Sequence, residues 1–540
     1  MLISFSKISE TTHSVNLGDD IHIDQIKTGD FNNDGKIDVV ISSIHRDLGT
    51  TPAPFIFLLG DEKGSFKDAS TFFVGGNIQY GNYVPRMEIG DINGDGVSDI
   101  FGIDNGIDKP PFSGGRNELF LSDGKGGMFN ASSFLPQLIL NSHGASLGDV
   151  NNDGRIDILV NALMSDGNHL WMQDKNGHFK ESPELLPPLK IDAYWDPTQQ
   201  VTQTNTYSAL IDINNDGFLD MILGGWSGGI NQSQIFINHQ GSFSSSIPTT
   251  LPSTGVNGET VVAIEPIDIN GDDLPDLVLS VTDGSNSANT FYLIKKIQIL
   301  INKGNGVFKD ESDQRITPTT EIISKGWYKT LDVIDLNKDG AMDIVAHPDW
   351  GSPEIFMNDG SGNFNKNIFI EKNYSKSSVG DFDGDGLPDL ILSNDKSSVE
   401  IWRNESINKH IYKENFGGDI LVGSTGNDIF IQTTGHSKFI GNGGIDTLQL
   451  TLDKNKYSIE ISDSKILVSQ IDSEKNSVEL LGVQRIKFST YSIATDINGN
   501  AGNVAKILGA VFGKDAIQNK GFVGVSLSVR SRMITHVLDE

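Results

Sequence analysis

One nine-residue pattern recurs seven times along the chain and constrains its fold more than any other feature. The pattern is D-x-[DN]-x-D-[GD]-x-x-D, and its copies are DFNNDGKID at Asp30, DINGDGVSD at Asp91, DVNNDGRID at Asp149, DINNDGFLD at Asp212, DINGDDLPD at Asp268, DLNKDGAMD at Asp335 and DFDGDGLPD at Asp381. Successive copies start 46–67 residues apart. Self-similarity at a period of this size is typical of repeat architectures such as propellers and solenoids. The chain is therefore expected to contain seven similar units.

Each nonamer leads into a short apolar stretch, and a second strand signal follows it. The stretches VVIS, IFGI, ILVN, MILGG, LVLS, IVAH and LILS predict buried strands. In six copies a later segment, such as FLLGDEKGSF or IFMNDGSGNF, combines a strand, a Gly/Asn/Asp turn and a strand opened by Phe, which predicts a β-hairpin. Each repeat thus holds about four strands, and seven four-stranded units predict a seven-bladed β-propeller.

The first residues of the chain resemble the part that the last repeat lacks. The seventh copy reaches IWRNES without a clear G-x-F strand after it, whereas ISFSKIS at residues 3–9 resembles GSFKDAS at residues 64–70. Phe5 also precedes Asp30 by 25 residues, as Phe66 precedes Asp91. We therefore expect an all-β propeller over residues 1–416, in which the N-terminal segment supplies the outer strand of the last blade and removes an open sheet edge.

The nonamer has oxygen ligands at the spacing of a cation-binding loop. Carboxylates or amides at positions 1, 3 and 5, a backbone carbonyl at position 7 and a carboxylate at position 9 can surround one ion, and glycine at position 6 permits the sharp turn. The first half matches an EF-hand loop, but position 12 carries no Glu and strands flank the loop in place of helices. Flexible oxygen coordination of this kind favours Ca²⁺ over Mg²⁺, which prefers strict octahedral geometry.

The sequence therefore predicts about seven calcium sites in the propeller. Asp273 replaces the glycine at position 6 of the fifth copy, which leaves the geometry of that loop open, and Asp383 gives the seventh copy a fourth carboxylate, so that copy should bind most tightly. The alternative is a set of empty turns, but 23 Asp carboxylates in seven short loops would repel one another without cations. The predicted ligands are Asp30, Asn32, Asp34, Asp38, Asp91, Asn93, Asp95, Asp99, Asp149, Asn151, Asp153, Asp157, Asp212, Asn214, Asp216, Asp220, Asp268, Asn270, Asp272, Asp276, Asp335, Asn337, Asp339, Asp343, Asp381, Asp383, Asp385 and Asp389.

The charge of the chain restricts its partners. The chain has 540 residues, 41 basic against 71 acidic side chains, a formal net charge of −30 and no cysteine. Nucleic acids and anionic membrane surfaces both attract basic proteins, so this charge argues against either partner. Without cysteine there is no disulfide, thiolate nucleophile or thiolate metal site. No run of about 18 apolar residues predicts a membrane span, and the N-terminus lacks the apolar core of a secretory signal peptide.

The motif, its spacing and its copy number together resemble the FG-GAP/VCBS repeat family, which includes the integrin α-like propellers. The resemblance covers about residues 3–416. It implies that the calcium loops lie on one face of the disc and are structural. Ligands or substrates are then expected to meet the opposite face.

The pattern changes after residue 416. GGDILVGSTGNDIF (417–430) and IGNGGIDTLQL (440–450) are fragments of a G-G-x-G-x-D-x-U-x rhythm, which builds a parallel β-roll with calcium between its turns. The alternative is a Gly-rich linker. The predicted ligands are Asp419, Asp428 and Asp446. We divide this part of the chain into an RTX-like β-roll at 417–452, a small β region at 453–499 and a helical tail at 500–540.

These C-terminal segments resemble the RTX (haemolysin-type) proteins. Residues 478–522 are similar to the segment that leads into a DUF4214-like region in bacterial proteins secreted by type I systems. The resemblance implies an uncleaved C-terminal export signal, secretion by type I machinery and folding on contact with external calcium. It implies an extracellular or cell-surface location, which agrees with the missing signal peptide, the absence of cysteine and the high acidity.

Candidate ligand-binding residues precede each nonamer, because strand alternation places that segment on the face opposite the loops. Residues five to eight positions before the first Asp should ring the mouth of the central channel, and Arg86, His143, Tyr207 and Tyr328 among them are the catalytic candidates. Aromatic side chains together with Arg, His and Asp suit sugars or other organic ligands, although several of them could instead pack in the blades. The remaining candidates are Trp327 and Tyr374 in the ring, and His45, Arg46, Arg116, Tyr194, Trp195, Asp196, Trp226 and Trp350 on longer loops of the same face.

Three classes of function remain open at this stage. The first is a secreted calcium-binding propeller that acts as an adhesion or binding module for an extracellular ligand, such as a glycan or cell-surface component. The second is a calcium-dependent enzyme, either a polysaccharide lyase or an alkylating enzyme of the cyanobacterial cylindrocyclophane type. The third is a structural component of an S-layer or matrix. The sequence lacks G-x-S-x-G, H-E-x-x-H and phosphate-loop motifs, which favours the first class.

Overall fold

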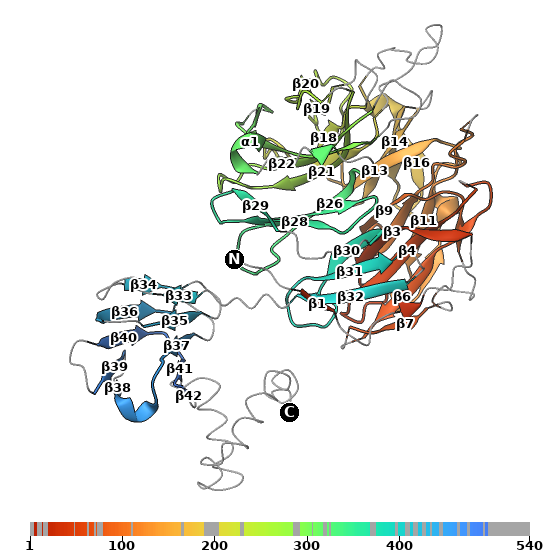
Figure 1. The fold of residues 1–540 in the computed structure, drawn as a ribbon. Coiled ribbons are helices and arrows are strands. Elements are labelled where there is room, and N and C mark those ends of the chain that lie inside the picture. Colours follow the sequence, from red (N-terminus) through yellow and green to blue (C-terminus); the bar gives the residue numbers. More distant parts are fainter. Residues whose placement is uncertain are drawn as a thin grey trace. The chain divides into compact units, whose positions relative to one another are not determined.

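The structure is a computed structural model that divides into two compact units, residues 2–405 without 337–339 and the remainder (Figure 1). It describes residues 5–494 except 8–12, 15–19, 48, 62–63, 70–71, 73–78, 110–111, 164–166, 188–204, 227–231, 257, 285–291, 305, 317–320, 323–325, 368–373, 395–397, 405–410, 414–419, 424–427, 433–434, 442–445, 462–464, 472–475 and 490–491. The predicted helical tail at 500–540 lies outside the described residues. No helix in the described part is long and apolar enough to cross a membrane.

The larger unit is an all-β propeller of seven blades, as the sequence predicts (Figure 1). Each blade is an antiparallel sheet in which the nonamer joins the first strand to the second. Blades 1 to 3 are β3 (Ile21–Gly29), β4 (Asp38–His45), β6 (Ile56–Gly60) and β7 (Phe66–Asp68); β9 (Arg86–Gly90), β10 (Asp99–Ile103), β11 (Glu118–Ser122) and β12 (Met128–Asn130); and β13 (Ser142–Gly148), β14 (Asp157–Ala162), β15 (Asn168–Gln173) and β16 (Phe179–Glu181). Blades 4 to 6 are β17 (Ser208–Ile211), β18 (Asp220–Leu223), β19 (Gln234–Phe236) and β20 (Thr249–Thr250); β21 (Glu259–Ile267), β22 (Asp276–Asp283), β23 (Ile294–Asn302) and β24 (Phe308–Asp310); and β26 (Tyr328–Ile334), β27 (Asp343–Pro348), β28 (Glu354–Asn358) and β29 (Phe364–Asn367).

The seventh blade combines both ends of the propeller sequence. Its strands β30 (Lys376–Gly380), β31 (Asp389–Asn394) and β32 (Ser398–Asn404) are followed in the sheet by β1 (Phe5–Lys7). β1 pairs antiparallel with β32, with Phe5 opposite Asn404. The Lys7 ammonium also forms an ion pair with the Glu400 carboxylate, at 3.0 Å. The N-terminal strand thus occupies the outer edge of the last blade.

The hydrophobic core lies between the blades. Seven clusters of buried side chains each combine residues of two neighbouring blades, from Phe31, Val40 and Phe120 between blades 1 and 2 to Ile41 and Ile401 between blades 7 and 1. The apolar stretches after the nonamers supply the second strand of each blade, which is buried on both faces. Because every blade shares its core with two others, the ring is the folding unit and not the single blade.

Short elements decorate the blades. They are β2 (His13–Ser14) beside β32, β5 (Ala53–Pro54) paired with β8 (Tyr80–Gly81), β25 (Glu321–Ile322) beside β23, the helix α1 (Ser312–Arg315), and 3₁₀ turns at Ser132–Phe134 and Pro183–Leu185. A third 3₁₀ turn, Lys454–Lys456, belongs to the smaller unit.

The smaller unit contains two five-stranded sheets built largely from parallel pairs. One has the order β33 (Ile411–Lys413), β35 (Ile429–Ile431), β37 (Thr447–Gln449), β41 (Arg485–Lys487) and β42 (Ser492–Ala494); the other has β34 (Ile420–Val422), β36 (His436–Ile440), β40 (Ser477–Leu481), β39 (Ile466–Gln470) and β38 (Tyr457–Ile461). In the three parallel pairs nearest its start, paired residues are 18 positions apart, which is two nine-residue repeats. Strands from the predicted roll and from the predicted small β region therefore share the same sheets.

Candidate functional site

The seven nonamer loops have nearly the same backbone. The residues at positions 4 and 6 adopt left-handed conformations in every copy, with φ between 54° and 91°. Glycine tolerates this conformation without steric cost, and Asn or Asp tolerates it better than most residues. Asp273, which replaces glycine at position 6 of the fifth loop, has φ 64°. Its N–H still donates to Asp268 Oδ2 at 3.0 Å, so the substitution leaves the loop intact.

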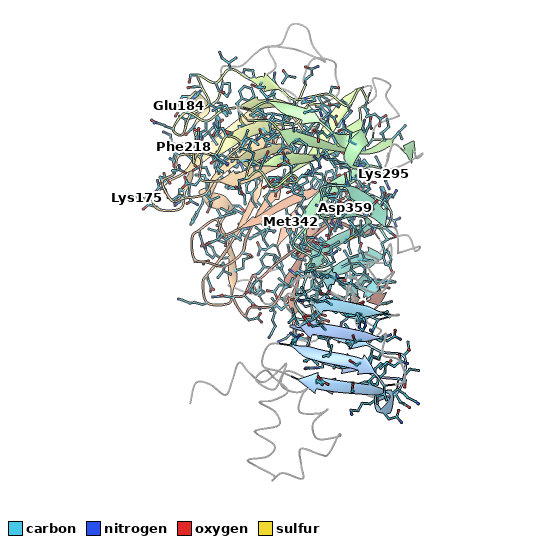
Figure 2. All side chains as sticks on the ribbon, turned by 90° about the vertical axis from the view of Figure 1, so that its left-hand side faces the viewer. Lys175, Glu184, Phe218, Lys295, Met342 and Asp359 are labelled. Carbon is cyan, nitrogen blue, oxygen red and sulfur yellow. The ribbon has the colours of Figure 1, made fainter. Side chains whose placement is uncertain are left out.

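Within each loop, backbone N–H groups point at the predicted ligand side chains. The position-1 carboxylate accepts the N–H of position 6 at 2.7–3.0 Å in all seven copies. The position-3 side chain accepts the N–H of position 5 at 2.9–3.1 Å. In five loops the Asn at position 3 also donates its Nδ2–H to the carboxylate at position 5. These bonds gather the oxygens of positions 1, 3 and 5 into one turn. Most of these side chains are partly or fully exposed, but Asn337 of the sixth loop and the Asp383 carboxylate of the seventh are only 1% exposed. The exposed Met342 lies at position 8 of the sixth loop (Figure 2).

The carboxylate at position 9 has a structural role that the sequence analysis missed. In all seven loops this Asp is fully buried. Its Oδ2 accepts the N–H of position 2 at 2.8–3.1 Å. Its Oδ1 accepts an N–H at or just after the end of the blade's third strand at 2.6–2.9 Å. The ninth-position Asp is therefore a clasp that fixes the loop to its own blade, and burial raises its pKa to about 6 or 7 in five of the copies.

Side-chain amides link successive loops around the ring. Four residues each form two of these bonds. The backbone N–H donates to the ninth-position Asp of the residue's own blade, and a side-chain N–H donates to the position-2 carbonyl of the preceding blade's nonamer. They are Gln173, Asn238, Asn302 and Asn404. The four side-chain bonds measure 2.8–2.9 Å. Each of these residues thereby joins two neighbouring nonamers.

The seventh loop has the densest group of carboxylates. Oxygens of Asp381, Asp383 and Asp385 all lie within 4.8 Å of one another. Asp381 Oδ1 is buried and accepts no hydrogen bond from any described residue. The Arg403 guanidinium contacts the Asp383 carboxylate and partly neutralises the group. An oxygen without a donor beside two further carboxylates suits a hard cation such as Ca²⁺.

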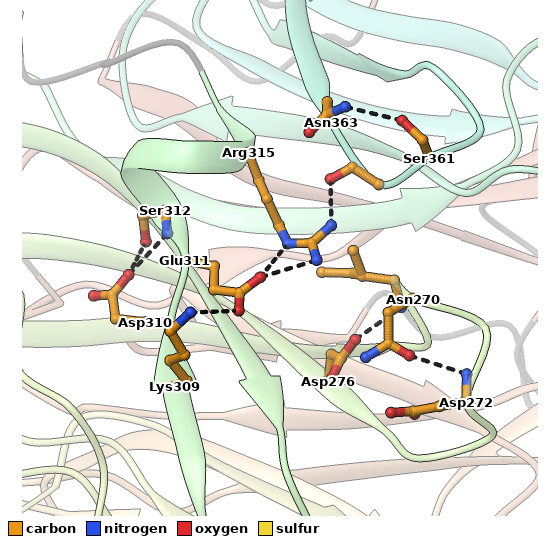
Figure 3. Close-up of polar contacts among 12 residues, drawn as sticks. Asn270, Asp272, Asp276, Lys309, Asp310, Glu311, Ser312, Arg315, Ser361 and Asn363 are labelled. Carbon is orange, nitrogen blue, oxygen red and sulfur yellow. Dashed lines mark hydrogen bonds and ion pairs between the residues drawn. The ribbon is translucent and has the colours of Figure 1, made fainter.

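The fifth loop lies beside an ion network that bridges two blades. Figure 3 shows Asn270 and Asp272 of this loop next to Glu311, whose carboxylate pairs with Lys309 at 3.0 Å and with Arg315 at 2.9 Å. Arg315 also donates to the carbonyl of Gly362, in the hairpin of the next blade, at 3.1 Å. The fifth loop, which departs from the pattern at Asp273, is thus flanked by an independent tie between blades 5 and 6.

In the smaller unit, Asp428 and Asp446 are fully buried. Asp446 Oδ1 accepts the N–H of Asp428 at 2.8 Å, while its Oδ2 is buried without a hydrogen-bond donor among the described residues. Burial first, and then the Asp428 charge, raise the pKa of Asp446 to about 6. Asp419, the third predicted ligand here, lies outside the described residues.

At the opposite end of the inner strands, β-bulges redirect side chains. The register shifts at Asp24 in β3, His143 in β13, Val262 in β21 and Lys329 in β26, each six positions before the first Asp of a nonamer. A bulge leaves one residue unpaired and turns its side chain away from the regular alternation. We call this end of the inner strands, farthest from the nonamers, the apical end.

Three predicted residues from alternate blades meet at the apical end. The Arg86 guanidinium of blade 2 lies 5.1 Å from the ring centroid of Tyr207, which precedes blade 4, and 5.9 Å from that of Trp327, which precedes blade 6. Tyr292 stacks on Trp327 at 4.9 Å and has a hydrogen bond with Trp226. Arg86 is only 6% exposed, whereas the aromatic side chains are half-buried. We call Arg86, Tyr207 and Trp327 the apical cluster.

A buried ion network lies at the same end and joins blades 1, 6 and 7. Lys329 Nζ is 3.1 Å from Asp24 Oδ2, and Lys376 Nζ is 2.5 Å from Asp349 Oδ1. Crossed contacts at 3.7 and 3.9 Å complete the group. Burial lowers the pKa of Lys329. Burial alone would raise the pKa of Asp349, but the charges of Lys376 and Lys329 outweigh it and hold that pKa below its ordinary value. Two cations and two anions thus neutralise one another.

Acidic side chains continue from the apical cluster along the inner strands. The Tyr207 hydroxyl hydrogen-bonds the Glu88 carboxylate, three positions before the second nonamer. Glu265 and Asp332 occupy the same position before the fifth and sixth nonamers, and Lys27 before the first. Burial first, and then the charges of Asp332 and Glu88, raise the pKa of Glu265 to about 8. Such a group holds its proton at neutral pH.

The other predicted ligand-binding residues are distributed differently. Tyr328 and Tyr374, expected at the channel mouth, are only 1% exposed and pack between blades, where their hydroxyls bond Glu354 and Glu400. For Tyr328, a bulge explains the burial, because Lys329 leaves the regular alternation there, while Trp327 before the strand reaches the apical cluster. His143 is half-buried; its Nδ1 bonds the Asn141 carbonyl at 3.1 Å, and burial first, then Arg86, lower its pKa to about 4.

Of the loop candidates that the structure describes, only Trp226 is connected to the apical cluster, through Tyr292. Trp350 is exposed and lies 5.5 Å from Lys376 Nζ, and Arg46 and Arg116 are exposed. His45 lies 3.3 Å from Asp47. Tyr194, Trp195 and Asp196 lie outside the described residues.

Comparison with known proteins agrees with this architecture. The FG-GAP-like repeat matches residues 30–102, 212–279, 268–346 and 335–392, which include every nonamer except the third. The third loop has the same internal hydrogen bonds as the others. No curated protein matches the chain.

Two solved structures show limited similarity. The extracellular domain of a protein described as a hybrid two-component system of B. thetaiotaomicron has 10% identity and a TM-score of 0.37, over 87% of this chain and 47% of that chain. A structure of BBS1N in complex with ARL6DN has 8% identity and a TM-score of 0.40, over 74% of this chain and 96% of that chain. This chain therefore spans about half the length of the first structure. The larger unit is thus a seven-bladed β-propeller, and parts of it match the FG-GAP-like repeat.

Proposed function

We propose that the chain is a calcium-stabilised extracellular binding module, whose ligand meets the apical end of the propeller. FG-GAP-like repeats in a propeller favour a binding or adhesion role over a purely structural one. The observation that carries the proposal is the meeting of Arg86, Tyr207 and Trp327 from blades 2, 4 and 6. Residues that are far apart in sequence and converge at one end of a rigid ring are typical of a binding site.

Calcium is the proposed ligand of the nonamers. The support is chemical: each loop gathers carboxylate and amide oxygens in one turn, and the seventh holds three carboxylates with an oxygen that lacks a donor among the described residues. Positions 1, 3 and 5 would supply side-chain oxygens, while position 9 is already committed to two backbone N–H groups. Bound Ca²⁺ would offset the repulsion among these carboxylates and stabilise the ring.

The smaller unit is proposed to be an RTX-like calcium roll that accompanies secretion by a type I system. Its support is the 18-residue spacing of the parallel pairs, together with Asp446, whose buried Oδ2 has no donor among the described residues. An extracellular location follows from the same proposal, because calcium is abundant there.

Calcium titration tests the metal part of the proposal. We expect the full chain, stripped with chelator, to bind several Ca²⁺ ions by calorimetry and to melt at a higher temperature when loaded. Asp383→Asn should weaken binding at the seventh loop. Asp359→Asn is the matched control, since Asp359 lies in an exposed hairpin turn and bonds only to its own turn. A melting temperature that does not change between chelator and millimolar Ca²⁺ would refute this part.

A glycan array tests the binding part. Calcium-loaded protein should bind a subset of glycans, and Trp327→Ala should abolish that binding without changing the melting temperature by more than a few degrees. Absence of any bound glycan, with calcium present and the fold intact, would argue against the proposed function.

A further inference from the structure

Arg86 is a buried cation that forms no ion pair within 4.0 Å in the described part of the chain. The residue is only 6% exposed, and its guanidinium lies against the rings of Tyr207 and Trp327. The charges of Glu88 and Asp349 also act on it, but at longer range than an ion pair. No described carboxylate lies within 4.0 Å of the guanidinium, and no described acceptor takes a hydrogen bond from it. Buried guanidinium groups are ordinarily paired, because a desolvated charge without a partner is costly.

The neighbouring charges do not fill this gap. Asp24 and Asp349 are engaged by Lys329 and Lys376, so the ion network is neutral in itself. The Glu88 carboxylate is held by the Tyr207 hydroxyl. The nearest imidazole, His143, is neutral at pH 7 because burial lowers its pKa to about 4. Among the described residues, Arg86 therefore has no partner at ion-pair distance, and the charges of Glu88 and Asp349 act on it only at longer range.

We propose that Arg86 binds a carboxylate group of the ligand, and that the ligand is an acidic saccharide. A guanidinium presents parallel N–H donors that match the two oxygens of a carboxylate. Tyr207 and Trp327 flank the guanidinium with half-buried aromatic faces, against which the apolar face of a sugar ring can lie. The inference rests on the proposed function and names the class of ligand for the same site.

The ligand chemistry can be tested with three small probes on the full, calcium-loaded protein. Tryptophan fluorescence, with Trp327 as the reporter, should follow the binding of glucuronate. Its methyl ester, which has the same ring without the charge, should bind at least about tenfold more weakly, since a charge-assisted pair of hydrogen bonds is lost. Equal affinity for glucuronate and its ester would overturn the proposal. Displacement of glucuronate by an equimolar amount of inorganic phosphate would also overturn it, because the site would then select anions and not acidic sugars.

Variants of Arg86 separate recognition from folding. Arg86→Met should remove glucuronate binding, and Arg86→Lys should weaken it by about tenfold because the forked geometry is lost. Arg485→Met removes the same charge from the smaller unit, outside the propeller, and should bind as the wild type does. Arg86→Met should also leave the melting temperature unchanged or raise it, because an unpaired buried charge is removed. A fall of more than a few degrees would instead show that Arg86 is a structural residue.

The outcomes distinguish this inference from the proposed function. If Trp327→Ala abolishes the binding of neutral glycans while Arg86→Met preserves it, the apical end is a binding site but the carboxylate assignment is wrong. If no glycan of either kind binds, the proposed function itself fails.

Discussion

Asp157, at position 9 of the third nonamer, provides a direct test of the clasp. Its carboxylate is fully buried and accepts the N–H of Val150 at 3.1 Å and that of Gln173 at 2.9 Å. In Asp157→Asn one oxygen becomes an NH₂ group, which faces a donor, so one of these buried N–H groups loses its acceptor. A hydrogen bond to a charged group contributes about 1.5–3 kcal/mol, and an unsatisfied buried donor costs about 1–3 kcal/mol.

Part of that loss is offset. The pKa of Asp157 is raised to about 6, mainly by burial, so the native state already disfavours its charge at neutral pH, and asparagine removes this cost. We therefore expect Asp157→Asn to lower the free energy of unfolding by about 2–4 kcal/mol.

The assay is urea unfolding in chelator, followed by the fluorescence of Trp171, which is buried in the core shared by blades 2 and 3. Asp153→Asn, at the exposed position 5 of the same loop, is the control and should change the unfolding free energy by less than about 0.5 kcal/mol in chelator. If both variants have the same small effect, the clasp does not stabilise the loop. If Asp157→Asn matters only when Ca²⁺ is present, its main role is metal coordination.

Three further predictions concern single side chains. As the pH rises from about 4.5 to 8, Glu265→Gln should become more stable than the wild type, by about 1–2 kcal/mol at pH 8. The reason is that the raised pKa keeps Glu265 protonated in the native wild type when the unfolded chain has lost that proton, so the wild type loses stability as the pH rises. The same difference in melting temperature between variant and wild type at pH 5 and at pH 8 would contradict this prediction. Asp273→Gly should raise the free energy of unfolding by about 0.5–1 kcal/mol and the melting temperature slightly, because glycine adopts the left-handed conformation without steric cost. A lower melting temperature would show that the contacts of the Asp273 side chain stabilise the loop by more than its backbone conformation costs. Lys329→Met should lower the free energy of unfolding by about 3–5 kcal/mol, because Asp24 loses its nearest partner. The double variant with Asp24→Asn should recover much of that loss. If the effects of the two single substitutions simply add in the double variant, the two residues are not a coupled pair.

The fold was largely predictable because its signal is repeated. Seven nonamers, each followed by an apolar strand and a hairpin, specify seven blades without any single copy having to be decisive. The third copy illustrates this, since it lies outside the family matches and still forms the same loop. The doubt about Asp273 arose from its residue type, and it disappears because Asp can adopt the left-handed conformation that the loop requires.

The apical end was only partly predictable. Their positions shortly before a nonamer predicted that Arg86, Tyr207 and Trp327 lie at this end, and the three side chains do meet there. The same criterion also led to Tyr328, which is buried, because a bulge shifts the alternation within one strand and leaves no mark in the residue pattern. Asp24 and Lys329 stand at the same distance before their nonamers, six residues, so alignment of the repeats by charge would have revealed them. The partnership of Asp349 with Lys376 could not be read in this way, since it joins a loop to the strand of another blade.

The amide links between successive loops have a consequence for how the ring responds to stress. Gln173 and Asn238 each bond the nonamer of the preceding blade as well as the ninth-position Asp of their own blade. Opening one loop therefore strains the next along blades 2, 3 and 4, and Asn302 extends the connection to blade 5. A propeller of independent blades would fray from its weakest member, as a stack of separate repeats does. In the linked blades, local opening of one loop is instead expected to be resisted by its neighbours, so the loops of blades 2 to 5 should lose their hydrogen-exchange protection together.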